Sequence, residues 1–151
     1  MSRIAHPALW LVILIGGGAA TAVTFAALAA QRLPDGPVAP VFDKEACAAC
    51  KMHVGEPRFA AQLQTTRGDV WFFDDPGCLA EHLIAEPPAV HAIWFHHHRE
   101  DRWVSADRAG FVPVQPTPMG FGYGAVDVGT PDAIPFEALC ARVRAQREAR
   151  R

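Results

Sequence analysis

Residues 70–79 read Val-Trp-Phe-Phe-Asp-Asp-Pro-Gly-Cys-Leu, and within this stretch a strand pattern gives way to a helix start. The aromatic run favours an extended strand. Asp75 is a good N-cap and Pro76 a good first helical residue. Apolar residues then recur at helical spacing until two prolines at 87–88 end the helix. The stretch therefore predicts a strand followed directly by a helix.

Strand patterns lie on both sides of this unit. Phe59 to Thr65 and Val70 to Phe73 flank Arg67-Gly68-Asp69, which predicts a β-hairpin. Val90 to Phe95 predicts a third strand after the helix. The first half of the body is therefore expected to run hairpin, helix, strand.

The second half is less regular. Short strands are expected at 102–105, 111–114 and 123–128, between turns rich in proline and glycine. Pro135 begins a closing helix. Its predicted apolar stripe consists of Phe136, Leu139, Cys140 and Val143. We expect an α+β body, in which the order of elements hints at two similar halves.

The N-terminal part differs from the rest in composition. Ala8 to Ala30 is a run of 23 residues without a charge, and about 20 apolar residues span a bilayer. A secretory signal peptide would explain Ala27 and Ala29 as a cleavage site, but its apolar core is usually only about 7 to 15 residues long. We favour an uncleaved anchor over residues 1–31, with Arg3 holding the N-terminus in the cytoplasm.

Both interpretations place the body outside the cytoplasm. The favoured arrangement is a single-pass inner-membrane protein whose body faces the periplasm. Residues 32–42 are rich in proline and predict a linker, 43–148 form the domain, and 149–151 are a basic tail. A lipid anchor directly after the leader is excluded, because the first cysteine is Cys47.

The distribution of charged residues along the sequence argues against one class of partner. Leu33 to Cys140 holds 15 acidic and 7 basic residues, whereas the last eleven residues hold five arginines and one glutamate. An acidic body matches a phosphate backbone poorly, because binding there requires clustered Lys and Arg. Nucleic acid is therefore not an expected partner, and the arginine-rich end is expected to be a solvated helix end.

Cys47 and Cys50 are the first candidate functional residues. Two thiols at this spacing on a turn can hold one metal ion or close a small disulfide, and spacing alone leaves both open. A c-type haem needs His directly after the second Cys, but Lys51 stands there. A thioredoxin-like pair would begin a helix, whereas Gly55 and Pro57 follow this one, so redox chemistry is less favoured.

Two methionines favour a soft metal ion. Met52 follows Cys50 by two positions, and its thioether suits Cu(I) better than a hard cation. Structural zinc usually takes four protein ligands, and no second Cys-x-x-Cys or His-x-x-x-His is present in the sequence. Met119 stands between Pro118 and Gly120, where it is expected to be exposed, although it could equally fill a gap in the core.

Other residues are weaker candidates. Cys78 lies early in the first predicted helix with His82 one turn later, so the pair could bind a metal, but a small thiol there is commonly a core residue. Cys140 belongs to an apolar stripe. The run 96–98 is His-His-His, yet successive strand residues alternate faces. No catalytic base, nucleophile or phosphate loop accompanies Asp74-Asp75, so an enzyme is not expected.

Taken together, these residues resemble the NosL family, the nitrous oxide reductase accessory proteins. The resemblance is carried, in order, by Cys47-Ala48-Ala49-Cys50-Lys51-Met52, by Trp71-Phe72-Phe73-Asp74-Asp75 with Cys78 after it, by Thr117-Pro118-Met119-Gly120 and by Ile134-Pro135-Phe136. These motifs extend from about Glu45 to Val143. The resemblance thus covers nearly the whole body.

The resemblance implies an extracytoplasmic Cu(I)-binding metallochaperone built from two related ββαβ-like halves. The family's Cys-x-x-Cys-x-Met falls on Cys47, Cys50 and Met52, and its copper-binding methionine falls on Met119. Such a protein hands copper to the assembly machinery of a copper enzyme or to the apo-enzyme, either nitrous oxide reductase or another enzyme such as a haem-copper oxidase. It takes no small-molecule substrate. Family members are commonly lipoproteins, whereas this sequence offers a membrane helix.

The alternative function is that of a membrane-anchored thiol-disulfide oxidoreductase. In that case Cys47 and Cys50 would cycle between thiol and disulfide, and Met119 would be irrelevant. An oxidoreductase keeps a labile disulfide and acts without metal, whereas a copper chaperone needs reduced thiols in order to load. The two hypotheses therefore differ in their requirement for copper.

Overall fold

The computed structural model describes residues 33–150. The predicted anchor, residues 1–31, lies outside the described residues, and so does Arg151 of the predicted basic tail. Within 33–150, no helix combines the length and the apolar character needed to cross a bilayer.

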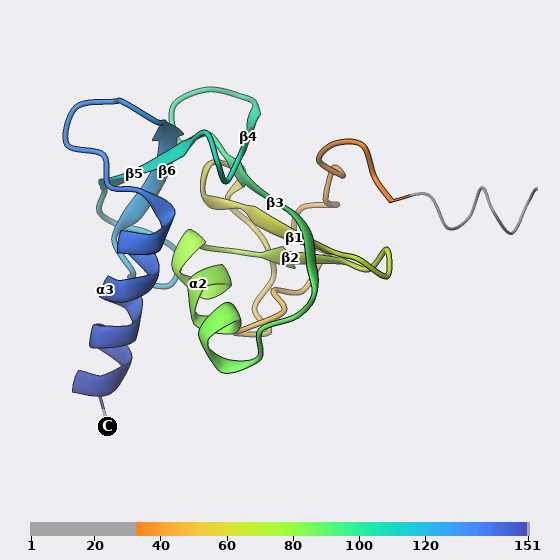
Figure 1. The fold of residues 1–151 in the computed structure, drawn as a ribbon, viewed down its shortest axis with the longest axis horizontal. Helices are drawn as coiled ribbons and strands as arrows, with labels where there is room; N and C mark the ends of the chain where they lie inside the picture. Colours follow the sequence, from red (N-terminus) through yellow and green to blue (C-terminus); the bar gives the residue numbers. More distant parts are fainter. Residues whose placement is uncertain (1–32, 151) are drawn as a thin grey trace, which may run out of the picture. The chain divides into compact units, whose positions relative to one another are not determined.

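The described residues form an α+β domain with two antiparallel sheets and two α-helices (Figure 1). In chain order the elements are η1 (Pro57–Phe59), β1 (Ala61–Thr65), β2 (Val70–Phe73), α2 (Pro76–Ala85), β3 (Val90–His96), β4 (Trp103–Ser105), β5 (Ala109–Pro113), β6 (Tyr123–Asp127) and α3 (Phe136–Ala149). One sheet has the strand order β2-β1-β3-β4, and the other consists of β5 and β6. The α+β class predicted from the sequence is confirmed.

The two halves of the domain are only partly alike. In the first half, β1 pairs with β2 and with β3, and α2 lies between β2 and β3 in the chain, as predicted. In the second half, β5 pairs with β6 and α3 follows, but β4 pairs with β3 of the first sheet. No strand follows α3 within residues 33–150. The ββαβ order is therefore complete in the first half, whereas the second half has a hairpin and a helix.

The local sequence explains how the two helices begin and pack. The Asp75 carboxylate accepts a hydrogen bond from the Gly77 N–H at 2.8 Å, and Pro76 occupies the first turn, as predicted. The stripe predicted for α3 faces inward, because Leu139 and Val143 are buried. The two helices lie side by side (Figure 1).

The segment that precedes the cysteine pair is held along the sheet. Buried Gln62 on β1 exchanges two hydrogen bonds with the backbone of Val38, which donates to Oε1 at 3.0 Å and accepts from Nε2 at 2.8 Å. Nε2 of Gln64 donates to the Gly36 carbonyl at 2.7 Å. Part of the predicted linker, residues 32–42, is therefore packed on the domain.

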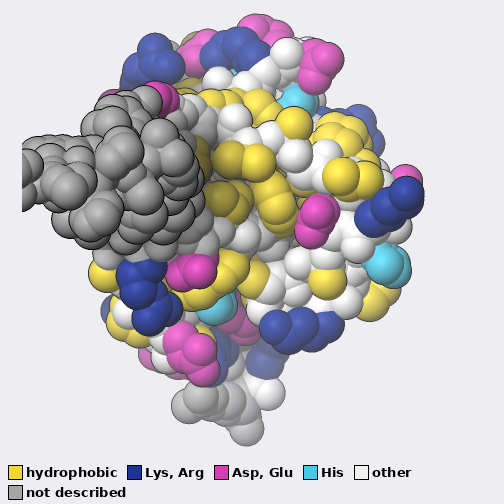
Figure 2. Space-filling view, turned by 90° about the vertical axis from the view of Figure 1, so that its right-hand side faces the viewer, with side chains coloured by type: hydrophobic (Ala, Val, Ile, Leu, Met, Phe, Trp, Pro, Cys, Tyr) yellow, Lys and Arg dark blue, Asp and Glu magenta, His cyan; other side chains and the backbone are white. Residues whose placement is uncertain are grey.

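The surface carries charges of both signs. On the face shown in Figure 2, Lys and Arg side chains are separated from one another by acidic, apolar and other groups. Arg102 contacts Glu100 at 2.6 Å and Asp127 at 2.5 Å, so this basic side chain is paired with two acidic ones. The face in Figure 2 therefore presents no continuous basic patch.

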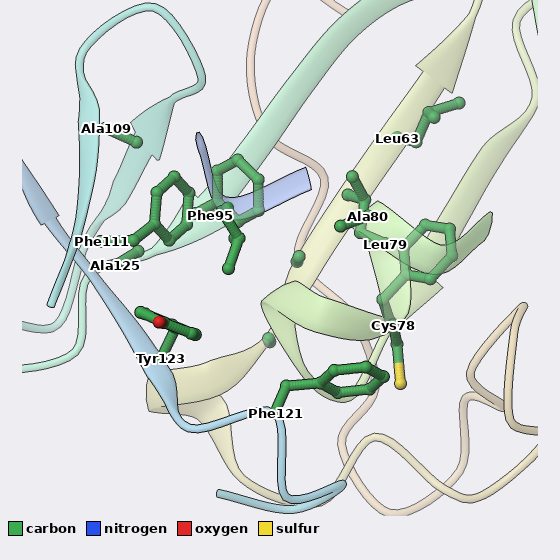
Figure 3. Packing of buried hydrophobic residues seen from close by; sticks show 14 of the residues in the cluster. Leu63, Cys78, Leu79, Ala80, Phe95, Ala109, Phe111, Phe121, Tyr123 and Ala125 are labelled. Carbon is green, nitrogen blue, oxygen red and sulfur yellow. The ribbon is translucent and has the colours of Figure 1, made fainter. Parts of the chain in front are cut away.

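An apolar cluster joins both sheets and both helices (Figure 3). The rings of Phe95 and Phe111 meet edge to face with centroids 4.8 Å apart, and the ring of Phe136 lies 5.2 Å from that of Phe95. These rings fix β5 and α3 against the first sheet. A Cβ atom at Gly77 would stand 2.0 Å from the ring of Phe121, so glycine is required where the segment before β6 packs on the start of α2.

Candidate metal centre

The cysteine pair lies on a tight turn, as predicted. The Cys47 N–H donates to the Met52 carbonyl at 2.8 Å, and the Lys51 N–H donates to the Cys47 carbonyl at 3.0 Å. Lys51 has a φ of 67°, in the left-handed region that a tight turn can require. The Ala48 N–H donates to the Phe72 carbonyl at 2.8 Å, which ties the turn to β2. This turn, residues 47–52, is called the cysteine loop below.

A third cysteine joins the pair. Cys78 lies in the first turn of α2, and in Figure 3 its sulfur points away from Leu79 and Ala80 and lies near the ring of Phe121. The sulfur atoms of Cys47, Cys50 and Cys78 lie within 4.8 Å of one another. Cys47 and Cys78 are buried, Cys50 is half-buried, and all three are free thiols. Among residues 33–150, no other group of three or more His, Cys, Asp or Glu side chains meets this distance criterion.

The spacing of the three sulfurs fits one metal ion. Three sulfurs at about 2.3 Å from a metal ion in a trigonal plane stand about 4 Å from each other. The observed sulfur–sulfur separations, each within 4.8 Å, are compatible with that geometry. Structural zinc takes four ligands, and no fourth Cys, His, Asp or Glu joins the group within the described residues. Three thiols alone favour a soft ion of low coordination number.

Hydrogen bonding distributes the protons unequally within the cluster. The Cys78 thiol donates to the Cys47 sulfur, and this bond, with three backbone N–H groups, lowers the pKa of Cys47 to about 5 despite burial. The same hydrogen bond and burial raise the pKa of Cys78. Burial also raises the pKa of Cys50. Cys47 is therefore a thiolate at neutral pH, and metal binding would release protons from the other two thiols.

Two adjacent carboxylates hold the segments around the cluster. Oδ1 of Asp74 accepts a hydrogen bond from the Gly55 N–H at 3.0 Å, just after the cysteine loop. Oδ2 of Asp75, the N-cap of α2, accepts from the Met119 N–H at 3.3 Å, and the carboxylate also accepts from the Thr117 hydroxyl. Burial raises the pKa of both carboxyl groups. The pair thus links the end of the loop, the start of α2 and the turn that carries Met119.

The two methionines predicted as ligands have different surroundings. Met119 is half-buried and packs against the apolar cluster that contains Cys78, so it is less exposed than its turn sequence indicates. Met52 is 60% exposed, although its carbonyl closes the cysteine loop. Met119 therefore lies at the turn held by Asp75, and Met52 lies at the outer rim of the loop.

Cys78 is the member of the cluster that sequence reasoning undervalued. The signal in the sequence is its place in the first turn after the Asp75 N-cap, where free N–H groups favour a thiolate. In the structure this expectation is wrong for the metal-free cluster, because the hydrogen bond to Cys47 and burial raise the pKa of Cys78. A cysteine of the hydrophobic core fits the same position, so the sequence pattern does not distinguish a metal ligand from a core residue. The hydrogen bond from the Ala48 N–H to the Phe72 carbonyl holds the cysteine loop at the end of β2, close in the chain to the helix that carries Cys78. This bond joins segments that are distant in sequence, so no local sequence pattern predicts it. Cys140 lies on α3 outside the group, as its stripe predicts.

Neither a protein-family profile nor a curated protein matches the sequence of this chain. Its fold is similar to the crystal structure of the copper chaperone NosL from Shewanella denitrificans, with a TM-score of 0.54. The similarity covers 74% of this chain and 89% of that chain, with 20% sequence identity. At this identity the comparison establishes the fold alone. The NosL-like fold expected from the motifs is therefore confirmed, while the function rests on the site.

Proposed function

We propose that this protein is a Cu(I)-binding metallochaperone. The observation that carries the proposal is the convergence of the thiols of Cys47, Cys50 and Cys78, within 4.8 Å of one another, from a loop and a helix start. Thiolates are the soft ligands that select Cu(I). The NosL-like fold supports the same function, since the similar structure is that of a copper chaperone.

The uneven burial of the ligands suits release by ligand exchange. Cys47 and Cys78 are buried and would keep the ion from water, whereas Cys50 is half-buried. A soft ligand of the recipient can replace the Cys50 sulfur while the two buried sulfurs still hold copper. Met52, 60% exposed at the rim, would then be a ligand that the ion meets on its way in or out. Copper can thus pass to another protein without becoming free.

Met119 completes the proposed ligand set of Cys47, Cys50, Met52 and Met119, to which Cys78 is now added. The hydrogen bond from its N–H to Asp75 fixes the Met119 turn to the helix start that carries Cys78. A thioether binds Cu(I) without adding charge. Met119 would therefore retain copper less strongly than a thiolate and leave it transferable.

We further propose that copper passes, outside the cytoplasm, to the assembly machinery of a copper enzyme or to the apo-enzyme. The motifs of this chain resemble those of the nitrous oxide reductase accessory proteins, so nitrous oxide reductase is the first candidate recipient. The uncharged run within residues 1–31 supports tethering to the inner membrane with the domain on the periplasmic side.

The geometry favours copper binding over thiol-disulfide exchange. In an oxidoreductase the thiolate must reach the disulfide of a substrate protein, so it is accessible. Here the thiol of low pKa, Cys47, is 0% exposed, whereas Cys50, whose pKa is raised, is the more accessible one. This arrangement is the reverse of what attack on a partner requires.

The test is an anaerobic titration of the reduced full chain with Cu(I), in competition with a chromogenic chelator. We expect about one Cu(I) per chain, and at least about tenfold weaker binding, or about 1.4 kcal/mol, after Cys47→Ser, Cys50→Ser or Cys78→Ser. Cys140→Ser is the matched control, because Cys140 is a free, half-buried cysteine outside the cluster. Binding that is equal in all four variants would refute the three-thiol site.

A further inference from the structure

The two thiols of the cysteine loop are placed to bind each other as well as a metal ion. The Lys51 N–H donates to the Cys47 carbonyl at 3.0 Å, which closes the loop as a single turn with a bond between residues four apart. The sulfurs of Cys47 and Cys50 lie within 4.8 Å of each other, and both thiols are free. Cys-x-x-Cys is also the spacing of reversible protein disulfides. The same loop can therefore exist in a dithiol form and in a disulfide form.

The two sulfurs of the loop differ in access and in hydrogen bonding. Cys47 is 0% exposed, whereas Cys50 is half-buried and the two residues after it, Lys51 and Met52, are exposed. The Cys78 thiol and three backbone N–H groups donate to the Cys47 sulfur, so they stabilise a thiolate there. In a Cys47–Cys50 disulfide, an incoming thiolate would therefore reach the sulfur of Cys50 and displace Cys47 as the leaving group.

Cys78 is a poor partner for such a disulfide. It is 1% exposed, and the Asp75 cap holds its backbone in the first turn of α2. A Cys47–Cys78 disulfide would have both sulfurs buried and closed to a thiol from another protein. A Cys50–Cys78 disulfide would release Cys78, which donates the hydrogen bond within the cluster and is the poorer leaving group. The geometry thus favours Cys47–Cys50 as the disulfide that another protein can open.

We propose that a dithiol reductase opens a Cys47–Cys50 disulfide before copper can load, and that Cys50 is the sulfur it attacks. This inference rests on the proposed copper function outside the cytoplasm, where protein disulfides supply the oxidised loop by thiol-disulfide exchange. The chain is then the substrate of the exchange. Burial of Cys47 makes this residue a poor attacker of other disulfides, but it does not hinder its departure as a leaving group.

The exchange balances in two steps. A thiolate of the reductase bonds to the Cys50 sulfur, the Cys47–Cys50 bond breaks, and Cys47 leaves as a thiolate that keeps its hydrogen bond from Cys78. The second thiol of the reductase then displaces Cys50, which takes up the proton that this thiol loses. The reductase dithiol is oxidised to a disulfide, and its two electrons reduce the loop. Cu(I) can bind only afterwards, because a disulfide offers no thiolate.

The first test compares the oxidised and reduced full chain. After treatment with diamide, we expect peptide mapping without reductant to show a Cys47–Cys50 disulfide, with Cys78 and Cys140 free. The oxidised chain should bind Cu(I) at least about a hundredfold more weakly than the reduced chain, and reduction by dithiothreitol, removed before the titration, should restore binding. Cys140→Ser is the control and should behave as the native chain. Equal affinity of the two forms, or a disulfide that contains Cys78, would overturn the proposal. A reduced chain that binds no Cu(I) would instead refute the proposed function.

The second test identifies the attacked sulfur, with oxidised glutathione as the probe and Cys140→Ser as the background. In Cys47→Ala, we expect the remaining loop thiol, Cys50, to form a mixed disulfide with glutathione at least about tenfold faster than Cys47 does in Cys50→Ala, because only Cys50 is accessible. Mass spectrometry of the peptides measures both rates, and near-UV circular dichroism checks that each variant keeps its fold. Equal rates, or a faster reaction of Cys47, would overturn Cys50 as the attacked sulfur.

Discussion

Two regions of the molecule are rich in metal-binding side chains, and they behave differently. In the cysteine cluster, three thiols from two separate segments converge within 4.8 Å. In the run 96–98, three histidines are adjacent in sequence but diverge. His96 contacts Asp101 at 3.2 Å, Nδ1 of His97 accepts from the Arg99 N–H at 3.2 Å, and the His98 ring lies 5.2 Å from that of Phe59. Proximity in sequence thus gives no common site here.

The difference follows from the backbone that carries each group. The histidines follow one another at the end of β3, where successive side chains leave the chain in different directions. Cys47 and Cys50 lie on a tight turn, and hydrogen bonds to Phe72 and Asp74 tie this part of the chain to the end of β2. Cys78 lies in the first turn of α2, which follows β2 directly in the chain. A metal centre requires ligand atoms that converge on one point. A high number of ligand residues in one stretch of sequence does not by itself produce that convergence.

The largest predicted effect concerns pH. The pKa of Cys47 is lowered from an ordinary value of 9.0 to about 5, so between these values the unfolded chain binds one proton more at this residue than the folded chain. The free energy of unfolding of the reduced, metal-free chain should therefore fall as the pH is lowered from about 9 to about 5, by up to about 1.4 kcal/mol per pH unit. Anaerobic urea denaturation measures it.

Two variants separate the cysteine cluster from the histidine run in that experiment. Cys47→Ser should flatten the slope above about pH 6.5, where histidine contributes little. Burial lowers the pKa of His97, so the folded chain resists its protonation and His97→Gln should change the slope only at lower pH. A native chain of constant stability between about pH 6.5 and 9 would contradict a Cys47 thiolate.

The second prediction breaks the convergence itself. Asp75→Ala removes the cap of α2 and the acceptor of the Met119 N–H, so we expect a loss of about 1–2 kcal/mol in the free energy of unfolding and weaker Cu(I) binding. Asp101→Ala is the matched control, because it removes an exposed carboxylate that pairs with His96. That change should cost less than about 1 kcal/mol and leave Cu(I) binding intact. Urea denaturation and chelator competition measure the two effects, and equal losses in both variants would count against the role of Asp75.

The sequence predicts the elements better than it predicts the site. The hairpin, α2 and the inward stripe of α3 follow from local signals such as the Asp75 cap and the spacing of Leu139 and Val143, and the structure confirms them. The place of β4 beside β3, and of Cys78 beside the cysteine loop, depends on pairings between distant segments. Contacts of this kind produce no periodic pattern in the sequence. The residues around Cys78 therefore fit a core cysteine as well as a metal ligand.

The third prediction asks how far the cluster extends beyond its thiols. Met119→Leu keeps the volume of the side chain and removes its sulfur, so the fold should be retained. We expect Cu(I) binding to weaken by about threefold to tenfold, on the order of 1 kcal/mol, less than for loss of a thiolate. Competition with a Cu(I) chelator measures the change. Leu83→Met is the control, because it makes the reverse exchange at a partly buried position of α2 and should leave the affinity unchanged. An affinity that is the same in Met119→Leu as in the native chain would remove Met119 from the ligand set.

The smallest predicted effect is that of the histidine run on copper. Each of its side chains has its own neighbours, and no third ligand from the described residues joins them, so His97→Gln and His98→Gln should leave both the stoichiometry and the affinity of Cu(I) binding unchanged. The measurement is the same anaerobic competition, with Cys78→Ser as the variant that must respond. If either histidine substitution weakens Cu(I) binding as much as Cys78→Ser does, the convergence of ligand atoms does not distinguish the cysteine cluster from the histidine run. The copper site would then lie at the end of β3.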